Sequence, residues 1–229
     1  MLERRYSTAT RSEVRSESDK PDVIFGRAAT YDVWTVLYKT RLSVVRERIN
    51  KGAFANALKE KQDVRALFNH DANFVLGRST SGTLRLEDGD DGLGYEIDPP
   101  DSQTVRDLVL TPMKRGDISG SSFAFSIRSG GEKWTEYEGK DGLDYYDRDV
   151  NDADLYDVSP VTFPAYDEST SGVRSGLPPE LRARIEKREA ARTRRPAPLR
   201  TRCRQWLDGN GALPADGAKS ATGPERIVK

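Results

Sequence analysis

The sequence predicts a mainly β fold, a barrel or sandwich of short strands with a few flanking helices, α+β overall. Three observations carry this prediction. β-branched and aromatic side chains gather in short runs, turn residues rich in Gly, Asp and Ser separate those runs, and few segments place apolar residues at helical spacing. Because the chain has 229 residues, one folded core with terminal segments is the expected organisation.

Strand character recurs in short apolar runs along most of the chain. These runs cover residues 23–25, 31–45, 64–68, 75–76, 83–86, 94–97, 122–127, 133–137 and 155–163. Two hairpins are expected, around the turn residues 88–92 and 129–131. The second hairpin would pair the run 122–127 with the run 133–137.

Two short helices are expected among the strands. The first follows Asn50, which can cap it, and places Ala53, Phe54, Ala57 and Leu58 at helical spacing. The second begins at Asp101 or Ser102, and Pro112 closes or kinks it. Its expected buried face consists of Val105, Leu108 and Val109.

Composition divides the chain into three parts. Residues 1–20 contain almost nothing to bury and are expected to form a flexible leader. Residues 21–174 are expected to form the folded domain. Residues 175–229 are expected to form a basic, largely disordered tail in which 179–195 can be one helix. The whole chain has 37 basic and 37 acidic residues. Residues 174–204, however, contain eleven Arg/Lys and only three Glu, a net charge of +8.

Several classes of protein are disfavoured by composition. One cysteine, Cys203, and one histidine, His70, exclude a disulfide framework and make a Cys/His zinc site nearly impossible. We expect no membrane segment and a soluble, non-secreted chain, since no apolar run is long enough to span a bilayer. Nucleic acid is disfavoured as a partner because the basic tail, residues 175–229, lacks interleaved aromatics apart from Trp206.

The best candidates for chemistry are His70 and a cluster of serines. His70 follows an apolar strand, while Ser119, Ser121 and Ser122 lie where a loop enters another apolar strand. A serine hydroxyl is a weak nucleophile unless a nearby base accepts its proton, and histidine suits that role. Taken singly, each feature has a plainer interpretation, as a strand-end histidine and as a polar turn.

Other reactive side chains are weaker candidates. Cys203 lies in the Arg-rich tail and is interpreted as a surface thiol. A group of carboxylates occupies a turn, where ordinary turn chemistry explains it. This group consists of Asp88, Asp90 and Asp91.

Between residues 24 and 174 the sequence resembles the prohead proteases of tailed bacteriophages, serine endopeptidases related to the herpesvirus assemblins. The matching strings are Gly52-Ala53-Phe54, Leu67-Phe68-Asn69-His70-Asp71, Leu76-Gly77-Arg78, Gly116 to Phe125 (GDISGSSFAF) and Asp157 to Tyr166 (DVSPVTFPAY). Their order and spacing make the resemblance specific. It implies an assemblin-like β-barrel.

The resemblance also implies roles for individual residues. His70 is the general base, and Ser122 is the nucleophile, with Ser119 and Ser121 as nearby alternatives. The nucleophile of the assemblins likewise precedes an apolar residue in a strand, which favours Ser122.

The third catalytic residue is expected at Asp157, where the assemblins have a second histidine. A carboxylate there can orient the imidazole and stabilise its cationic form. Asp71, beside His70, is the alternative for this role. Oxyanion donors are implied near Ala165 and Tyr166.

The function implied is cleavage of the major capsid protein and scaffold during procapsid maturation. The enzyme would need no metal or nucleotide cofactor, would act in the host cytoplasm inside the assembling procapsid, and can form a homo-oligomer. The composition break at residues 171–172 suggests self-cleavage of the basic tail. The alternative is a non-catalytic scaffolding or coat-binding component of the procapsid.

Overall fold

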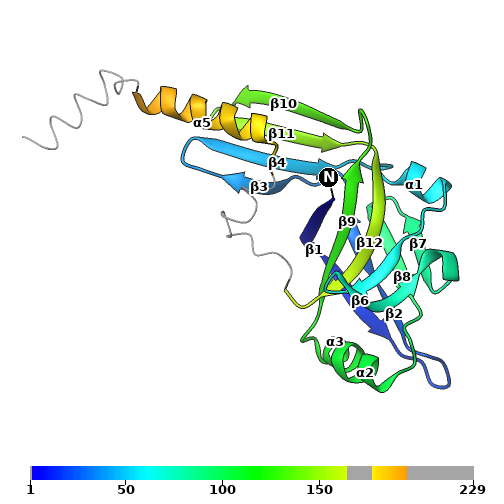
Figure 1. Cartoon of the computed structure of the whole chain (residues 1–229). Coiled ribbons are helices and arrows are strands. Elements are labelled where there is room, and N and C mark those ends of the chain that lie inside the picture. The colour runs from blue at the N-terminus through cyan, green and yellow to red at the C-terminus, as the bar shows by residue number, and fades with distance from the viewer. Residues whose placement is uncertain (1, 164–176, 195–229) are drawn as a thin grey trace, which may run out of the picture. The chain divides into compact units, whose positions relative to one another are not determined.

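The computed structural model describes residues 2–163 and 177–194, and the predicted mainly β fold with few helices is confirmed (Figure 1). The strands are β1 (Glu3–Arg15), β2 (Val23–Thr30), β3 (Thr35–Lys39), β4 (Ser43–Ile49), β5 (Arg65–Phe68), β6 (Asp71–Arg78), β7 (Leu84–Asp88), β8 (Gly92–Ile97), β9 (Gly120–Ile127), β10 (Glu132–Glu138), β11 (Asp144–Val150) and β12 (Ala153–Val161). The helical segments are α1 (Ala55–Lys59), η1 (Ser79–Ser81), α2 (Gln103–Val105), η2 (Arg106–Leu110), α3 (Thr111–Arg115) and α5 (Pro179–Arg194).

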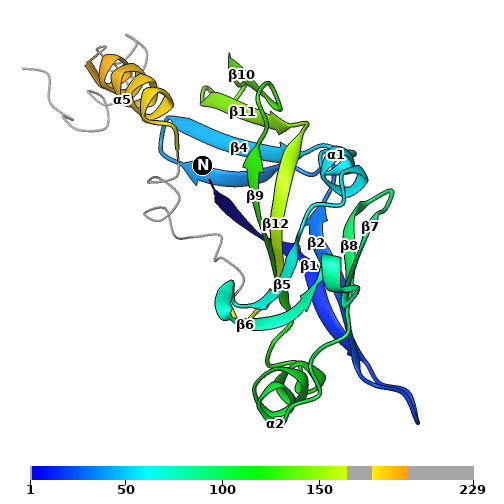
Figure 2. The same ribbon diagram turned by 45° about the vertical axis from the view of Figure 1, so that its right-hand side comes forward.

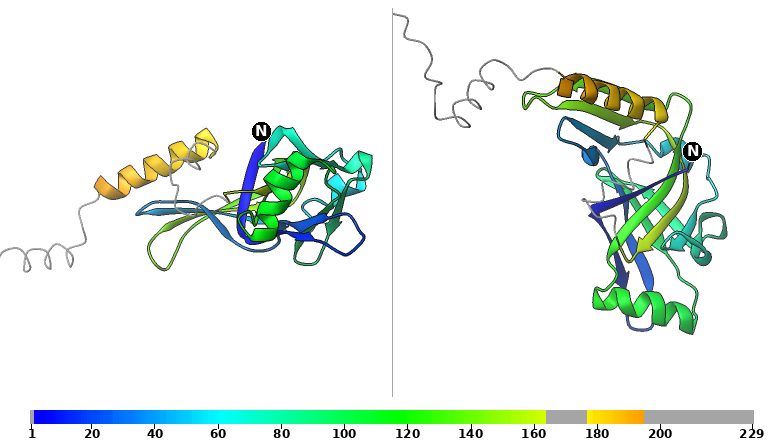
Figure 3. Two further views of the ribbon diagram at one scale, coloured as in Figure 1. Left: turned by 90° about the horizontal axis from the view of Figure 1, so that it is seen from below. Right: turned by 60° about the vertical axis from the view of Figure 1, so that its left-hand side comes forward.

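Eight strands form one curled sheet in the order β6-β5-β12-β9-β1-β2-β8-β7 (Figure 2). The two edge strands, β6 and β7, follow each other in the chain through the short turn η1, so the sheet curls back toward its own edge as a nearly closed barrel (Figure 3). Gly77 permits the close approach at this seam, because a Cβ there would lie 2.7 Å from the carbonyl oxygen of Thr83.

Aromatic side chains fill the barrel. Phe54, which precedes α1, packs edge-to-face against Phe123 and Phe125 of β9, with ring centroids 5.7 and 6.4 Å apart. All three rings are almost fully buried. The inward face of β9 is therefore apolar, which directs its alternate residues to the opposite face.

A second sheet has the order β10-β11-β4-β3, with β4 and β11 parallel. Leu177, Leu181 and Ile185 are buried in one apolar cluster with Val45 and Tyr146 of this sheet. Chain contacts accordingly place residues 1–185 in one compact unit and residues 186–229 in another. The helix predicted over 179–195 is confirmed as α5.

The prediction that the tail begins at residue 175 is wrong, because the packed unit continues to Ile185. Leu177, Leu181 and Ile185 recur every four residues, so one helix face is apolar although the segment as a whole is rich in arginine. Average composition concealed that stripe. The expectation of a disordered tail beyond residue 194 lies outside the described residues.

The flexible leader expected over residues 1–20 is also wrong for most of its length. Residues 3–15 form β1, which pairs antiparallel with both β9 and β2. Ser12 is buried there, and its hydroxyl contacts the Tyr95 hydroxyl at 2.5 Å. A polar strand can be ordered because its backbone groups pair on both sides, which composition does not report.

Of the two expected hairpins, one is confirmed. β7 and β8 form the hairpin around residues 88–92. The other is wrong, because β10 pairs with β11 while β9 pairs with β1 and β12. The first expected helix is present as α1, but it begins at Ala55 and has no side-chain cap, so the Asn50 cap is wrong.

The second helix runs from Gln103 to Arg115 as α2, η2 and α3 without ending at Pro112. The Ser102 hydroxyl caps it by accepting the Val105 N–H at 3.2 Å. Its middle turn, η2, is π-helical, which accommodates the N–H that Pro112 lacks. None of the helices in residues 2–163 and 177–194 has the length and hydropathy to cross a membrane.

The buried face of this helix differs from the expected one at one position. Val105 and Val109 are buried, but Leu108 is 53% exposed. We predict that Val109→Ala lowers the free energy of unfolding by about 2 kcal/mol, since two buried methyl groups are lost and a cavity remains. Leu108→Ala should change it by less than about 0.5 kcal/mol. Urea denaturation of both variants measures the difference, and equal losses would contradict this helix orientation.

Candidate active site

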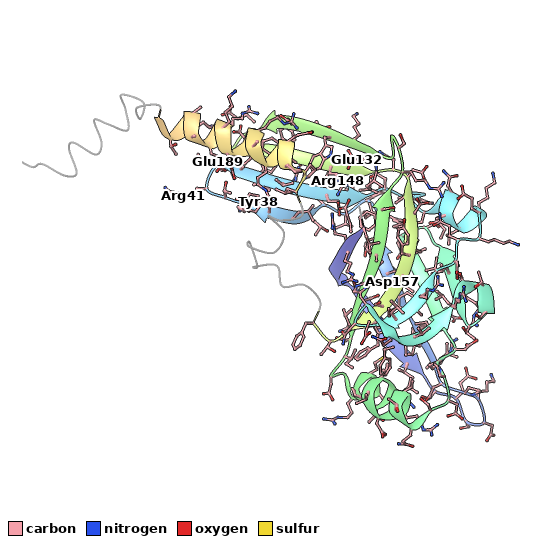
Figure 4. The ribbon with its side chains drawn as sticks, in the orientation of Figure 1. Tyr38, Arg41, Glu132, Arg148, Asp157 and Glu189 are labelled. Atoms are coloured by element: carbon pink, nitrogen blue, oxygen red, sulfur yellow. The ribbon has the colours of Figure 1, made fainter. Side chains whose placement is uncertain are left out.

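Three neighbouring strands bring the predicted site residues together. β12 pairs with β5 on one side and with β9 on the other. His70 follows the end of β5, Asp157 lies on β12 (Figure 4), and Ser122 lies on β9. His70 therefore contacts Asp157 and Ser122, which lie 87 and 52 positions later in the sequence, on the two strands next along the sheet.

His70 occupies a tight turn between β5 and β6. Both turn residues, Asn69 and His70, have positive φ, 54° and 57°, as a two-residue type I′ hairpin requires. The turn is tied to the end of β12, because the Asn69 N–H donates to the Pro160 carbonyl at 3.0 Å and the Thr162 N–H donates to Asn69 Oδ1 at 2.9 Å. These bonds stabilise a backbone conformation that is otherwise unfavourable for histidine.

A β-bulge in β12 sets the direction of Asp157. Leu155 pairs with Phe125 and Asp157 with Ala124, so Tyr156 is an extra residue in the ladder. The alternation of inward and outward side chains is shifted by one position there. Asp157 consequently shares the face of Ser122, whereas regular alternation would place it beside Leu155 in the core.

The side chains form a continuous hydrogen-bonded chain. His70 Nδ1 lies 2.5 Å from Asp157 Oδ1, and His70 Nε2 is hydrogen-bonded to Ser122 Oγ. Because an ionised carboxylate only accepts hydrogen bonds, Nδ1 carries the proton and Nε2 is free to accept one from serine. The imidazole is thus oriented for proton exchange with the hydroxyl.

Ser159 is a further member of this chain that the sequence interpretation missed. Its buried hydroxyl donates to Asp157 Oδ1 at 2.8 Å and lies 3.3 Å from His70 Nδ1. It directly faces Ser122 in the β12–β9 ladder. The period of two along a strand is the signal that could have found it, since Ser159 follows Asp157 by two residues.

The alternative serines lie elsewhere. Ser121 belongs to the opposite face of β9, where its hydroxyl contacts the buried Tyr95 hydroxyl at 3.1 Å. Burial raises the pKa of that Tyr95 hydroxyl. Ser119 precedes β9 and is exposed. Neither residue has a place in the chain that joins Ser122 to His70.

The alternative acid, Asp71, is exposed and accepts hydrogen bonds from the backbone N–H and the side-chain amide of Asn73, at 2.8 and 3.0 Å. Its carboxylate thus caps its own turn. Among the described residues, no group of three or more His, Cys, Asp or Glu side chains is arranged to hold a metal ion. Ala165, Tyr166 and Cys203 lie outside the described residues.

Ser122 is fully buried, and His70 is only 7% exposed. The Ser122 hydroxyl also donates to the backbone carbonyl of Arg5 at 2.8 Å. This carbonyl belongs to β1, the neighbour of β9 on the side opposite β12. The serine proton therefore has two competing acceptors, His70 Nε2 and the Arg5 oxygen.

The chain is similar to a known protein family and to a solved structure. The chain has no significant match among curated proteins. Among solved structures it matches the capsid assembly protease of bacteriophage T4, with 12% identity over 70% of this chain and 96% of that chain, and a TM-score of 0.34. The family model for caudovirus prohead serine protease matches residues 9–177. Because that match spans well over half of the 229 residues, the chain belongs to the caudovirus prohead serine protease family.

Proposed function

We propose that this protein is a serine endopeptidase that cleaves the capsid and scaffold proteins during procapsid maturation. Family membership supports a capsid assembly protease. The observation that carries the serine mechanism is the hydrogen-bonded chain Ser122–His70–Asp157 on three adjacent strands. The major capsid protein and scaffold are the proposed substrates, and the assembling procapsid in the host cytoplasm is the proposed place of action.

In the proposed mechanism, Ser122 Oγ attacks the carbonyl carbon of the scissile peptide bond while His70 Nε2 accepts its proton. Asp157 accepts a hydrogen bond from Nδ1–H and stabilises the imidazolium. His70 then donates the proton to the leaving amine, which yields the acyl-enzyme. Water, deprotonated by His70, attacks the acyl carbon, and His70 returns this proton to Ser122 Oγ as the C–Oγ bond breaks, which releases the acid product and regenerates the enzyme.

A non-catalytic scaffolding or coat-binding role is the alternative. The direct contacts between a hydroxyl, an imidazole and a carboxylate favour the enzyme, because a binding surface does not require that order of groups. A scaffolding role would leave coat protein uncut, so the two functions differ in a measurable product.

The first test of the catalytic assignment compares serine variants. Ser122→Ala and His70→Ala should each reduce proteolysis by about 10³-fold or more, because each removes a group that acts on the reacting atoms. Ser119→Ala should remain within about twofold of wild type, because substitutions of exposed side chains away from the site have small effects. The measurement is the mass of a major capsid protein from the same phage after co-expression with each variant. Cleavage by Ser122→Ala with Ser119→Ala inactive would reassign the nucleophile.

The second test concerns the acid. Asp157→Asn should lower kcat by about 10²- to 10⁴-fold, since an amide can hold the imidazole in the wrong tautomer. Asp71→Asn is the matched control and should have a much smaller effect, because that carboxylate caps its own turn. If the two variants rank in the opposite order in kcat, Asp71 is the orienting acid.

Self-cleavage of the basic segment is part of the same proposal. Leu177, Leu181 and Ile185 are packed into the body, so cleavage before Ile185 would have to act on a helix in contact with the second sheet. The proposed cut therefore follows Ile185. Removal would take away much of the positive charge between residues 174 and 204.

Intact mass during incubation tests this self-cleavage. Wild type should yield a fragment that ends between Ile185 and about Arg204, the end of the basic segment, while Ser122→Ala stays whole. Equal trimming of both proteins would assign the cut to another protease. If wild type and Ser122→Ala both stay uncleaved inside assembled procapsids, the self-cleavage proposal is contradicted.

A further inference from the structure

The first residues of β1 lie along the strand that carries Ser122. Residues 3–7 pair antiparallel with β9, with Tyr6 opposite Ser122 and Arg5 opposite Phe123. On its other side β9 pairs with β12, with Ser159 opposite Ser122. Both backbone edges of β9 are thus occupied at the position of the nucleophile.

This arrangement leaves an extended peptide with no edge on β9 to which it can add. Peptides often bind proteins as an added strand, through main-chain hydrogen bonds to an exposed sheet edge. β12 carries Asp157 and Ser159 and belongs to the site. The edge facing β1 is therefore the one that a substrate strand can occupy beside Ser122, and residues 3–7 now fill it.

The contact between Ser122 and Arg5 opposes activation of the serine hydroxyl. The Arg5 carbonyl presents its oxygen to Ser122 Oγ, at 2.8 Å, and accepts the hydroxyl proton. Nucleophilic attack requires that proton to point to His70 Nε2. While Arg5 holds the proton, the hydroxyl is not activated.

Residues 3–7 are separable from the rest of β1. Ser7 pairs with Ser121 and Arg11 with Gly120. Four residues of β1 thus span one residue of β9, so the β1–β9 pairing is interrupted between Ser7 and Arg11. Residues 12–15 pair with β2 in their own ladder. The segment 3–7 can therefore leave β9 without opening the β1–β2 pairing. It also precedes residue 9, where the family match begins.

A cluster of ion pairs holds this segment in place. Arg5 Nε contacts Glu47 Oε1 at 2.5 Å, and the two Glu3 oxygens accept from the Arg148 guanidinium at 2.7 and 2.8 Å. Arg148 Nη1 also contacts Glu47 at 2.8 Å, and Arg148 Nε contacts Glu132 at 2.6 Å. Figure 4 shows Arg148 and Glu132 on the second sheet.

The charges in this cluster stabilise one another against burial. Burial alone would raise the pKa of Glu3, but the hydrogen bond and charge of Arg148, with Arg5, lower it below its ordinary value. Burial opposes the charge on Arg5 as well, yet the Glu47 carboxylate raises the pKa of Arg5. Loss of one partner leaves a buried charge uncompensated, which weakens the attachment of the segment.

We propose that residues 3–7 are an autoinhibitory strand, which occupies the position of an extended peptide substrate on β9 and is latched by Arg5 and Glu3 to Glu47 and Arg148. The proposal rests on the proposed function and adds its regulation. Proteolysis then requires the strand to leave β9, which opens the edge and leaves His70 Nε2 as the acceptor for the Ser122 hydroxyl.

The test uses two neighbouring arginines in the full-length chain. Arg5→Ala removes the Arg5–Glu47 half of the latch and leaves the Glu3–Arg148 bonds, while Arg4→Ala removes the same charge from an exposed side chain one residue earlier. A fluorophosphonate probe should label Ser122 about tenfold faster in Arg5→Ala than in wild type, because the open population grows. Arg4→Ala should stay within about twofold of wild type. An Arg5→Ala rate equal to or below that of Arg4→Ala would overturn the proposal.

Hydrogen exchange separates this proposal from the proposed function, because it requires no catalysis. Backbone amides of residues 120–125 should exchange faster in Arg5→Ala than in Arg4→Ala. Equal exchange would show that the strand is not released and would overturn the inference. Faster exchange with no probe labelling in any variant would instead contradict the serine mechanism and leave the strand release supported.

A peptide added in trans tests the substrate-like position. The peptide with the sequence of residues 2–8, LERRYST, should slow probe labelling of Arg5→Ala. The same peptide with alanine in place of Arg5 is the control and should slow it less. No protection by the native peptide at millimolar concentration would contradict occupation of the substrate position.

Discussion

One extra residue in β12 sets the direction of the Asp157 carboxylate, and the candidate site depends on it. Leu155 and Val158 both lie in the barrel core although they are three residues apart, because the bulge at Tyr156 shifts the alternation. Asp157 and Ser159 therefore face Ser122. Without the bulge the carboxylate would enter an apolar core, where an unpaired charge is strongly unfavourable. The geometry of the site is thus a consequence of strand register.

The barrel and the second sheet meet through charge rather than through apolar packing alone. Arg148 of β11 and Glu47 of β4 bind side chains of β1, which itself joins the two halves of the eight-stranded sheet. The same strand places the Arg5 carbonyl against Ser122. The strand that completes the barrel wall is therefore also in contact with the proposed nucleophile, so stability and access to the site are coupled.

Predictions from local sequence patterns were correct where residues that are close in the chain are also in contact in the structure. The hairpin around residues 88–92 and the cap at Ser102 were predictable because both depend on a few consecutive residues. The pairing of 122–127 with 133–137 was wrong because a turn signal reports a reversal of the chain and not the partner of each strand. The leader was missed for a related reason, since β1 is ordered by two partner strands and by distant carboxylates.

The sequence by itself determined the chemical groups, because a single histidine, a serine before an apolar strand and an acid in Asp157-Val158-Ser159-Pro160 can be recognised without coordinates. Tertiary structure brought Ser122, which the resemblance already favoured, against His70, and it alone decided that Ser159 joins Asp157 and that β1 covers Ser122. The physical reason is that side-chain direction in a sheet alternates residue by residue. A single bulge or register shift therefore reverses it, and only the pairing of distant strands fixes where such shifts fall.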